Sequence, residues 1–250
     1  MTADPLPPVI GHRGACGHAP ENTIASIRKA AELGARWVEF DTKLSSDGHV
    51  IVFHDDRVER TTDGEGPVAD MDLSALKGLD AGGWYAEGFM GEPIPTLAEA
   101  MAALAELGLG GNVEIKPSPG REAETGRRVA LVLARDWPGN LPRPLISSFS
   151  AESLAAAAAA APAIPRALLV LKFPKDWHRQ LRELGCQALH CLNRRITPSR
   201  ARALNEAGYA IRAFTVNNRR RGARLLGWGV QGVITNYPER MLPLVRRPKA

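Results

Sequence analysis

Residues 37–56 read WVEFDTKLSSDGHVIVFHDD, two runs rich in β-branched and aromatic residues around an Asp-Gly pair at 47–48. An Asp-Gly pair between two such runs predicts a β-hairpin. Because side chains alternate between the faces of a strand, Glu39 and Asp41 point to the same side. With Asp-Gly at the two central turn positions, the register places His54 opposite Asp41. The stretch therefore predicts that a histidine and two carboxylates converge; the alternative is a surface hairpin with a solvated acidic edge.

Outward from the hairpin, short apolar runs alternate with helical patterns along the chain. The hairpin arm 50–54 is taken as an extension, and eight runs remain as strands, starting near Val9, Trp37, Asn112, Leu145, Arg166, Ala188, Ala210 and Gly232. Strands that alternate with helices form parallel sheets through right-handed crossovers. Eight strands in 250 residues predict an α/β fold, a (β/α)8 TIM barrel with a β-hairpin extension and a small insertion after strand two.

The insertion covers about residues 57–95 of a single domain that spans residues 1–250. It is rich in glycine and weakly periodic, and only residues 72–79 favour a short helix. Loops of this length in compact domains are usually functional. We therefore expect a lid over a binding site, with Trp84 in contact with the substrate; the alternative is a variable surface insertion.

The composition indicates a globular protein of the cytoplasm. No run of about 18 apolar residues predicts a transmembrane helix, and the first residues lack the pattern of a signal peptide. Three cysteines, an odd number without paired spacing, favour a reducing compartment. The net charge of +5 comes from arginine clusters that lack interleaved aromatic residues. We therefore expect a small anionic molecule as the partner, and no nucleic acid.

Polar residues follow two further strands at the end where each strand leads into the next helix. His12 and Arg13 end the first strand, and Glu114 and Lys116 lie two apart on the third. The carboxyl ends of barrel strands meet at one mouth, where active sites are built. We therefore expect these four residues beside the acidic and histidine side chains of the hairpin. Taken alone, His12 is also compatible with a core histidine. Glu114 and Lys116 are also compatible with a structural ion pair.

Such a cluster has the chemistry for phosphodiester cleavage. The carboxylates Glu39, Asp41 and Glu114 suit a hard divalent cation, Mg²⁺ or Ca²⁺, better than zinc, which prefers histidine and cysteine ligands. The guanidinium and ammonium groups match phosphate oxygens. Two histidines supply a general base and a general acid.

Motifs spread over nearly the whole chain carry a family resemblance. The chain resembles the glycerophosphodiester phosphodiesterases and matches their motifs in order: GHRG at 11–14, PENT at 20–23, EFD at 39–41, DG at 47–48 with HDD at 54–56, TTDG at 61–64, DAG at 80–82 with Trp84, IPTL at 94–97, EIK at 114–116, SF at 148–149, TVN at 215–217 and GVITN at 232–236. The set is highly specific, although GHRG or EFD alone would be weak.

The resemblance implies the reaction and assigns residues to it. Family members hydrolyse glycerophosphodiesters, such as glycerophosphocholine, to sn-glycerol 3-phosphate and an alcohol. The glycerol 2-hydroxyl attacks phosphorus and expels the alcohol, and water then opens the cyclic phosphate. By motif match, the acid–base pair is His12 and His54, the divalent metal is bound by Glu39, Asp41 and Glu114, and the phosphate is held by Arg13 and Lys116. Our hypothesis is that His12 is the base and His54 the acid in the first step.

One residue departs from the family pattern. Many bacterial relatives have a tryptophan before the TVN motif, where this chain has Phe214. We expect Phe214 to contact the substrate as an aromatic wall without a hydrogen-bonding edge. The substitution therefore bears on the preference for the alcohol or the glycerol, not on the reaction.

Two other functions are compatible with the same barrel. A lysophospholipase D-type lipid phosphodiesterase would need an apolar groove, which the aromatic residues of the insertion and Met90 can supply, but no basic amphipathic helix or anchor predicts stable membrane insertion. A non-catalytic anion-binding barrel predicts the loss of a histidine or metal ligand, and all of them are present.

Overall fold

The barrel closes as the alternating pattern predicts. In the computed structural model, which describes residues 6–245, eight parallel strands form a ring in which β1 pairs with both β2 and β9. The strands are β1 (Val9–His12), β2 (Trp37–Leu44), β4 (Gly110–Ile115), β5 (Leu145–Ser148), β6 (Arg166–Val170), β7 (Ala188–Leu192), β8 (Ala210–Phe214) and β9 (Gly232–Thr235). The (β/α)8 prediction is confirmed.

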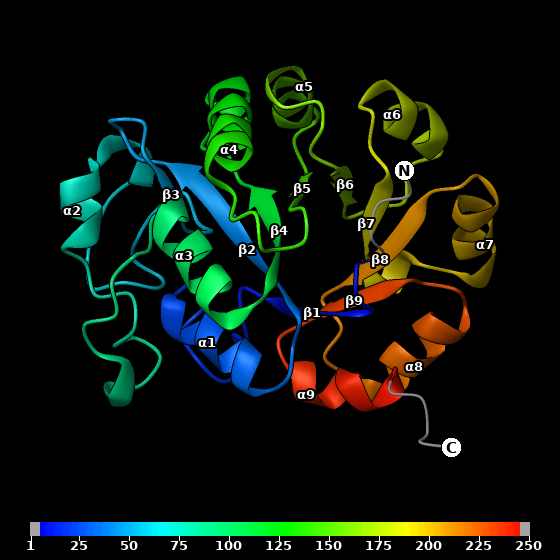
Figure 1. Ribbon diagram of the computed structural model, residues 1–250, viewed down its shortest axis with the longest axis horizontal. Helices are drawn as coiled ribbons and strands as arrows, with labels where there is room; N and C mark the ends of the chain where they lie inside the picture. Colours follow the sequence, from blue (N-terminus) through cyan, green and yellow to red (C-terminus); the bar gives the residue numbers. More distant parts are fainter. Residues whose placement is uncertain (1–5, 246–250) are drawn as a thin grey trace.

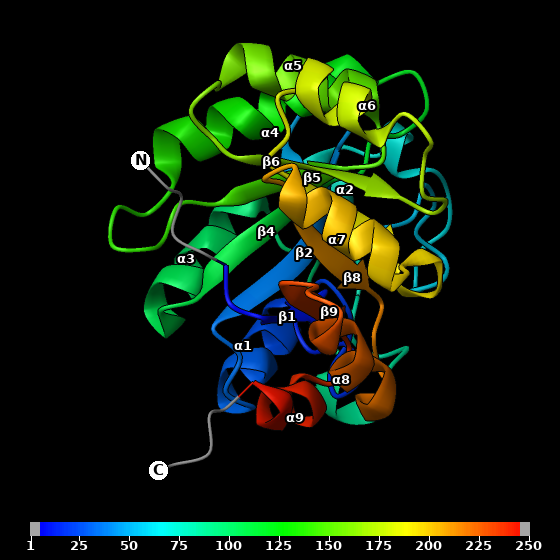
Figure 2. The ribbon, with the colours of Figure 1, turned by 90° about the vertical axis from the view of Figure 1, so that its right-hand side faces the viewer.

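Helices surround the strands as an outer layer (Figures 1 and 2). They are α1 (Ile24–Glu32), α3 (Leu97–Leu107), α4 (Glu122–Asp136), α5 (Ala151–Ala160), α6 (Trp177–Glu183), α7 (Pro198–Glu206), α8 (Arg219–Gly227) and α9 (Pro238–Met241). Side-chain caps explain where several begin. The Thr96 hydroxyl, for example, accepts a hydrogen bond from the Glu99 N–H, and the Glu99 carboxylate accepts one from the Thr96 N–H, a capping box that starts α3.

Strand alternation separates the structural core from the functional face. On β2, Val38 and Phe40 are fully buried in the core shared with the helices. Glu39 and Asp41 occupy the alternate positions and point into the barrel. The inner face therefore carries the charges, and the outer face holds the helices in place.

The turn of the hairpin holds three residues rather than two. The Ser45 N–H donates to the His49 carbonyl (3.0 Å), and the Gly48 N–H donates to the Ser45 carbonyl (3.1 Å). Gly48 has φ +82°, a left-handed conformation that glycine adopts without steric cost. Three-residue hairpin loops commonly end on such a residue. The expectation that Asp47 and Gly48 are the two central residues is therefore wrong by one position.

The longer turn shifts the register of the hairpin. β3 (Val50–Val52) runs antiparallel to β2, with Thr42 opposite Val52. The next pair joins the Phe53 N–H to the Asp41 carbonyl at 3.0 Å. Phe53, and not His54, therefore lies opposite Asp41, and His54 follows just beyond the end of the ladder.

The insertion has more structure than its sequence pattern predicts. It contains η1 (Val68–Asp70), α2 (Leu73–Lys77) and η2 (Glu87–Phe89). These elements enclose a small core of their own, formed with β3 by Ile51, Phe53, Val58, Val68, Leu76, Ala81 and Ile94. In Figure 1 the insertion lies beside the barrel, next to β3 and α3.

Candidate active site at the carboxyl ends of the strands

Three buried carboxylates form the centre of the site. Asp41 on β2 lies beside Glu114 on β4 in the parallel register, and Glu39 lies two residues earlier on β2. One oxygen atom from each carboxylate lies within 4.8 Å of the others. Glu39, Asp41 and Glu114 are each at most 6% exposed. Water therefore screens this concentrated negative charge poorly.

The proton affinities of the carboxylates reflect that crowding. Burial, reinforced by Asp41 and Glu114, raises the pKa of Glu39 well above its usual range. Burial and the charge of Asp41 also raise the pKa of Glu114, to about 7. Burial opposes ionisation of Asp41 as well, but Arg13 and Lys116 outweigh it and lower the pKa of that carboxyl. Glu39 Oε1 is buried and has no partner among the described residues.

Arg13 and Lys116 flank the carboxylates. The Arg13 Nε lies 3.2 Å from an Asp41 oxygen, and its backbone N–H donates to Glu39 at 3.0 Å. Lys116 Nζ lies 2.6 Å from Glu114 and 3.4 Å from Asp41. Two positively charged side chains therefore lie beside three carboxyl groups, as the residue spacing on strands one to three predicts.

A local backbone constraint places Arg13. Arg13 has φ +49° and Gly14 has φ +82°, so the chain turns sharply as β1 ends. A Cβ atom on Gly14 would collide with Ser26 of α1. The glycine is thus needed for close approach of this turn to α1, which holds Arg13 over the barrel.

His12 hydrogen bonds to a residue near the carboxyl-terminal end of the chain. Its Nδ1 lies 2.8 Å from Asn236 Oδ1, just after β9, and its Nε2 lies 3.9 Å from Glu39. Burial, together with the charge of Arg13, lowers the pKa of His12 to about 4. The ring is neutral near pH 7, with Nδ1–H donating to Asn236 and the Nε2 lone pair free to accept a proton.

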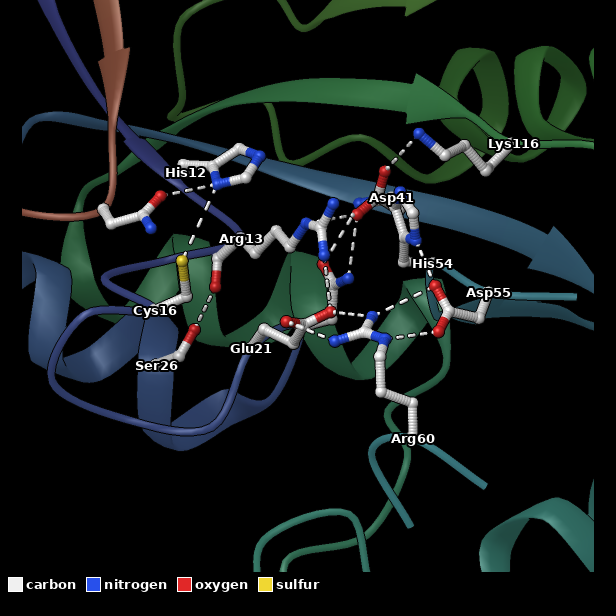
Figure 3. A network of polar contacts seen from close by, with 12 residues as sticks. His12, Arg13, Cys16, Glu21, Ser26, Asp41, His54, Asp55, Arg60 and Lys116 are labelled. Atoms are coloured by element: carbon white, nitrogen blue, oxygen red, sulfur yellow. Dashed lines mark hydrogen bonds and ion pairs between the residues drawn. The ribbon is translucent and has the colours of Figure 1, made fainter. Parts of the chain in front are cut away.

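His54 has a different partner. Its Nδ1 hydrogen bonds to the adjacent Asp55 carboxylate, which in turn is held by Arg60. Burial lowers the pKa of His54, while the charge of Asp41 opposes that shift. Figure 3 shows His54 above Asp55 and close to Asp41. The one-residue register shift therefore does not remove His54 from the site.

One cavity of about 230 Å³ is lined by both histidines, both positively charged side chains and two of the three carboxylates. Its walls are His12, Arg13, Glu39, His54, Glu114, Lys116, Phe149, Leu169, Leu192, Phe214, Thr215 and Ile234. An adjoining open groove of about 590 Å³ shares His54, Lys116 and Phe149 with it. Phe214 packs edge-on against Phe149, with ring centroids 5.8 Å apart.

Trp84 lies apart from this cavity, whereas Asp41, which also does not line it, contacts the lining residues Arg13 and Lys116. Trp84 is 41% exposed, and its Nε1 donates to the Ala81 carbonyl of the same insertion at 2.9 Å. It belongs to neither set of lining residues. A contact between Trp84 and the substrate stays a prediction.

Sequence reasoning missed the residues that support the site. Asn236, Glu21 and Asp55 contact predicted site residues but received no role of their own. Arg60, which also received none, contacts Glu21 and Asp55. Three of these four residues lie in motifs already quoted for the resemblance. Their side chains are common surface types, so the motif alone marked their positions and only the fold shows their contacts.

Comparison with known proteins finds relatives that are similar over most of the chain. The family model "Glycerophosphoryl diester phosphodiesterase family" matches residues 12–240. A glycerophosphodiester phosphodiesterase from Caldanaerobacter subterraneus is 38% identical over 96% of this chain and 98% of its own length. One from Bacillus subtilis is 32% identical over 92% of this chain and 83% of its own length.

A solved structure is also similar over nearly its whole length. It is an Oleispira antarctica phosphodiesterase in complex with the product sn-glycerol-3-phosphate, 40% identical, with a TM-score of 0.93. The match covers 96% of this chain and 97% of that one. A glycerophosphodiester phosphodiesterase from Agrobacterium tumefaciens is 27% identical, with a TM-score of 0.80, and covers 95% of this chain and 100% of its own.

Proposed function

The chain belongs to the glycerophosphoryl diester phosphodiesterase family, and on that premise we propose a metal-dependent hydrolysis carried out by His12 and His54. The substrates are glycerophosphodiesters, and the products are sn-glycerol 3-phosphate and an alcohol. The observation that supports this most directly is the shared cavity. Two histidines, two cations and two of the three clustered acids line one space of about 230 Å³.

The phosphate group is held by Arg13 and Lys116. Both side chains line the cavity, and the planar guanidinium matches two phosphate oxygens at once. Glu21 accepts from Arg13 Nη1 at 2.6 Å and Asp41 lies beside its Nε, so the guanidinium is oriented before substrate binds. Such preorganisation lowers the cost of holding the phosphate.

Glu39, Asp41 and Glu114 fit a hard divalent cation, Mg²⁺ or Ca²⁺. Their donor set is all oxygen, Glu39 Oε1 is buried without a partner among the described residues, and burial with the charges of Asp41 and Glu114 raises the pKa of Glu39. When bound, such a cation supplies positive charge to the phosphate oxygens. Arg13 and Lys116 add to that charge from the protein's own side chains.

His12 and His54 divide the proton transfers. His12 Nε2 accepts the proton of the glycerol 2-hydroxyl as that oxygen attacks phosphorus. The bond from phosphorus to the alcohol oxygen breaks, and His54 Nε2 protonates the departing alcohol. In the second step His54 takes a proton from water, which attacks the cyclic phosphate, and His12 returns its proton to the 2-oxygen.

Asn236 and Asp55 support this assignment of roles. The Asn236 carbonyl oxygen is neutral, and the low pKa of His12, near 4, suits a base that begins unprotonated. Burial lowers the pKa of His54, and the hydrogen bond from the ring to the Asp55 carboxylate opposes that shift, so His54 keeps more of the proton affinity that an acid needs than it would beside a neutral partner. Phe214 and Phe149 form the apolar wall against which the glycerol or the alcohol packs. Trp84 would contact the substrate from the insertion.

The cytoplasm is the compartment that the cysteines favour. Cys16, Cys186 and Cys191 are free thiols, and two of them are buried. Unpaired thiols are typical of reducing compartments. Among residues 6–245, no helix is both long and apolar enough to cross a membrane.

One assay tests the proposal. Purified protein is treated with chelator, supplied with Mg²⁺ or Ca²⁺, and assayed for release of sn-glycerol 3-phosphate from glycerophosphocholine, beside His54→Ala. We expect release that needs a divalent cation and falls by roughly 10²–10⁴-fold in the variant. Release in the presence of chelator, or full activity of His54→Ala, would contradict the mechanism.

A further inference from the structure

Arg60 lies in the insertion, at its junction with the catalytic hairpin. Its neighbours Val58 and Thr61 are buried, and the Thr62 hydroxyl donates to the Val58 carbonyl at 2.8 Å. The backbone around Arg60 is therefore anchored. Its side chain is 46% exposed and reaches toward the barrel, between Glu21 and Asp55 (Figure 3).

One guanidinium holds two carboxylates. Arg60 Nη1 and Nη2 donate to the two oxygens of Glu21 at 3.0 and 2.7 Å. Nη2 also donates to Asp55 at 3.0 Å, and Nε donates to the second Asp55 oxygen. Two-point contacts of this kind fix both distance and orientation, unlike contacts from a lysine ammonium.

Each of these carboxylates continues to a residue of the cavity. Asp55 accepts from His54 Nδ1, and Glu21 accepts from Arg13 Nη1 at 2.6 Å. The β1–α1 turn that carries Arg13 and the segment after β3 that carries His54 are far apart in sequence. Within the described residues, the Glu21–Arg60–Asp55 chain of contacts links them directly (Figure 3).

We propose that Arg60 is a positioning residue that sets the placement of His54 relative to Arg13. The inference rests on the proposed function, in which His54 is the proton donor and Arg13 holds the phosphate. Through Asp55, Arg60 fixes the His54 ring with Nδ1–H toward the carboxylate and Nε2 available to the substrate. Through Glu21, it fixes the plane of the Arg13 guanidinium.

Electrostatics agrees with this geometry. Without Arg60, Glu21 and Asp55 would face one another across a partly buried edge of the site, with 13% and 25% of their side chains exposed. Both carboxylates lie within 3.0 Å of Arg60 Nη2, and two negative charges this close together repel. Burial raises the pKa of Asp55, but the hydrogen bonds from Arg60 and His54 outweigh it and lower that pKa to about 2. Asp55 therefore stays an acceptor for His54 through the neutral range.

A solvated ion pair is the alternative, and the chain contains a matched control for it. Arg57 lies three residues earlier and pairs with Glu59, with 61% of its side chain exposed. This pair contacts neither Glu21 nor Asp55. Arg57→Ala therefore removes an arginine from the same segment without touching the site.

The experiment compares Arg60→Ala with Arg57→Ala in the glycerol 3-phosphate release assay, beside wild type and His54→Ala. We expect Arg60→Ala to lower kcat/KM by roughly 10-fold to 100-fold, as loss of an orienting partner typically does. Arg57→Ala stays within about twofold of wild type, as expected for a surface substitution. Free guanidinium ion, at a concentration that leaves the protein folded, restores part of the activity of Arg60→Ala only.

Double variants separate the effect of Arg60 on His54 through Asp55 from its effect on Arg13 through Glu21. In an Asp55→Ala background, adding Arg60→Ala should no longer lower kcat. Arg60→Ala should also raise KM through the loss of its contact with Glu21, and in a Glu21→Ala background Arg60→Ala should no longer raise KM. Effects that simply add in both backgrounds would overturn the proposal, because residues in one contact network are coupled.

Two further outcomes keep the test decisive. If Arg60→Ala does not fold, Arg60→Lys replaces it, since the ammonium keeps the charge but cannot hold both carboxylates in two-point contacts. Wild-type kcat/KM in that variant, or an equal loss in Arg57→Ala, would overturn the role of Arg60. Lack of activity in wild type, or full activity in His54→Ala, would instead contradict the proposed function itself.

Discussion

Asn236 Oδ1 lies 2.8 Å from His12 Nδ1, across 224 positions of sequence. The contact joins the first and last strands of the barrel at the catalytic face, because β1 and β9 are neighbours in the closed ring. A histidine that donates through Nδ1 presents Nε2 as the acceptor. The closure of the barrel thereby favours the tautomer that the proposed role of His12 as general base requires.

Asn236→Ala should therefore lower kcat without removing His12. The ring would lose its acceptor at Nδ1 and sample other orientations, so we expect a loss smaller than the roughly 10²–10⁴-fold contribution of a general base. Steady-state kinetics on glycerophosphocholine measure it. The double variant with His12→Ala should be no slower than His12→Ala alone; a further drop would mean that Asn236 acts independently of His12.

Glu39→Gln should abolish stabilisation by the divalent cation while leaving the metal-free protein at least as stable. Burial, together with the charges of Asp41 and Glu114, raises the pKa of Glu39, so ionisation of this carboxyl is unfavourable without a cation. Thermal unfolding in chelator and in Mg²⁺ or Ca²⁺ measures both effects. For wild type, a cation at about 100 times its Kd adds ~2.7 kcal/mol.

Glu106→Gln is the control for that measurement. Glu106 is exposed and pairs with Arg28 on the outside of the barrel, so its loss should leave the metal-dependent shift in Tm unchanged. An undiminished shift in Glu39→Gln would remove Glu39 from the set of proposed metal ligands.

Local pattern was sufficient to predict the barrel but not its irregular parts. Each strand–helix unit carries its own alternation and caps, as with Thr96 and Glu99 at the start of α3. The insertion builds its small core from residues such as Val58, Leu76 and Ile94, which are spaced with neither helical nor strand period. Such a core forms by packing against β3, so the local sequence pattern of the insertion does not predict it.

The hairpin shows how one turn residue changes a register. Asp-Gly suggested a two-residue turn, whereas Gly48 ends a three-residue loop in the left-handed conformation. His54 still reaches the site because it lies beyond the ladder, where pairing no longer dictates its direction. Contacts such as Asn236 with His12, or Arg60 with Glu21, join distant segments and are set by ring closure and tertiary packing.

Phe214→Ala should weaken substrate binding more than catalysis. Phe214 and Phe149 line the cavity but offer no group for proton transfer. We expect KM for glycerophosphocholine to rise about tenfold, equivalent to ~1.4 kcal/mol, with kcat changed much less. Trp84→Ala belongs in the same series, because an equal rise in KM there would place the insertion in the binding site. Loss of kcat alone in Phe214→Ala would contradict a role in binding.

His190 should make the fold less stable in mild acid. It is fully buried on β7 beside Arg212, and neither ring nitrogen has a hydrogen-bond partner in the part of the chain that the structure describes. Burial, with the charge of Arg212, lowers its pKa well below 6.5. Between that folded value and 6.5 the unfolded chain binds the extra proton, so stability falls as pH decreases through this window.

His190→Leu tests that relationship. Between pH 7.5 and 5.5, the free energy of unfolding of wild type should fall by ~1.4 kcal/mol more than that of the variant, which is one proton over one pH unit below 6.5. Urea unfolding at the two pH values measures the difference. His49→Gln, at the exposed hairpin turn, is the control and should keep the wild-type dependence. The same dependence in His190→Leu would mean that His190 is protonated in the folded protein, or that other groups carry the whole effect.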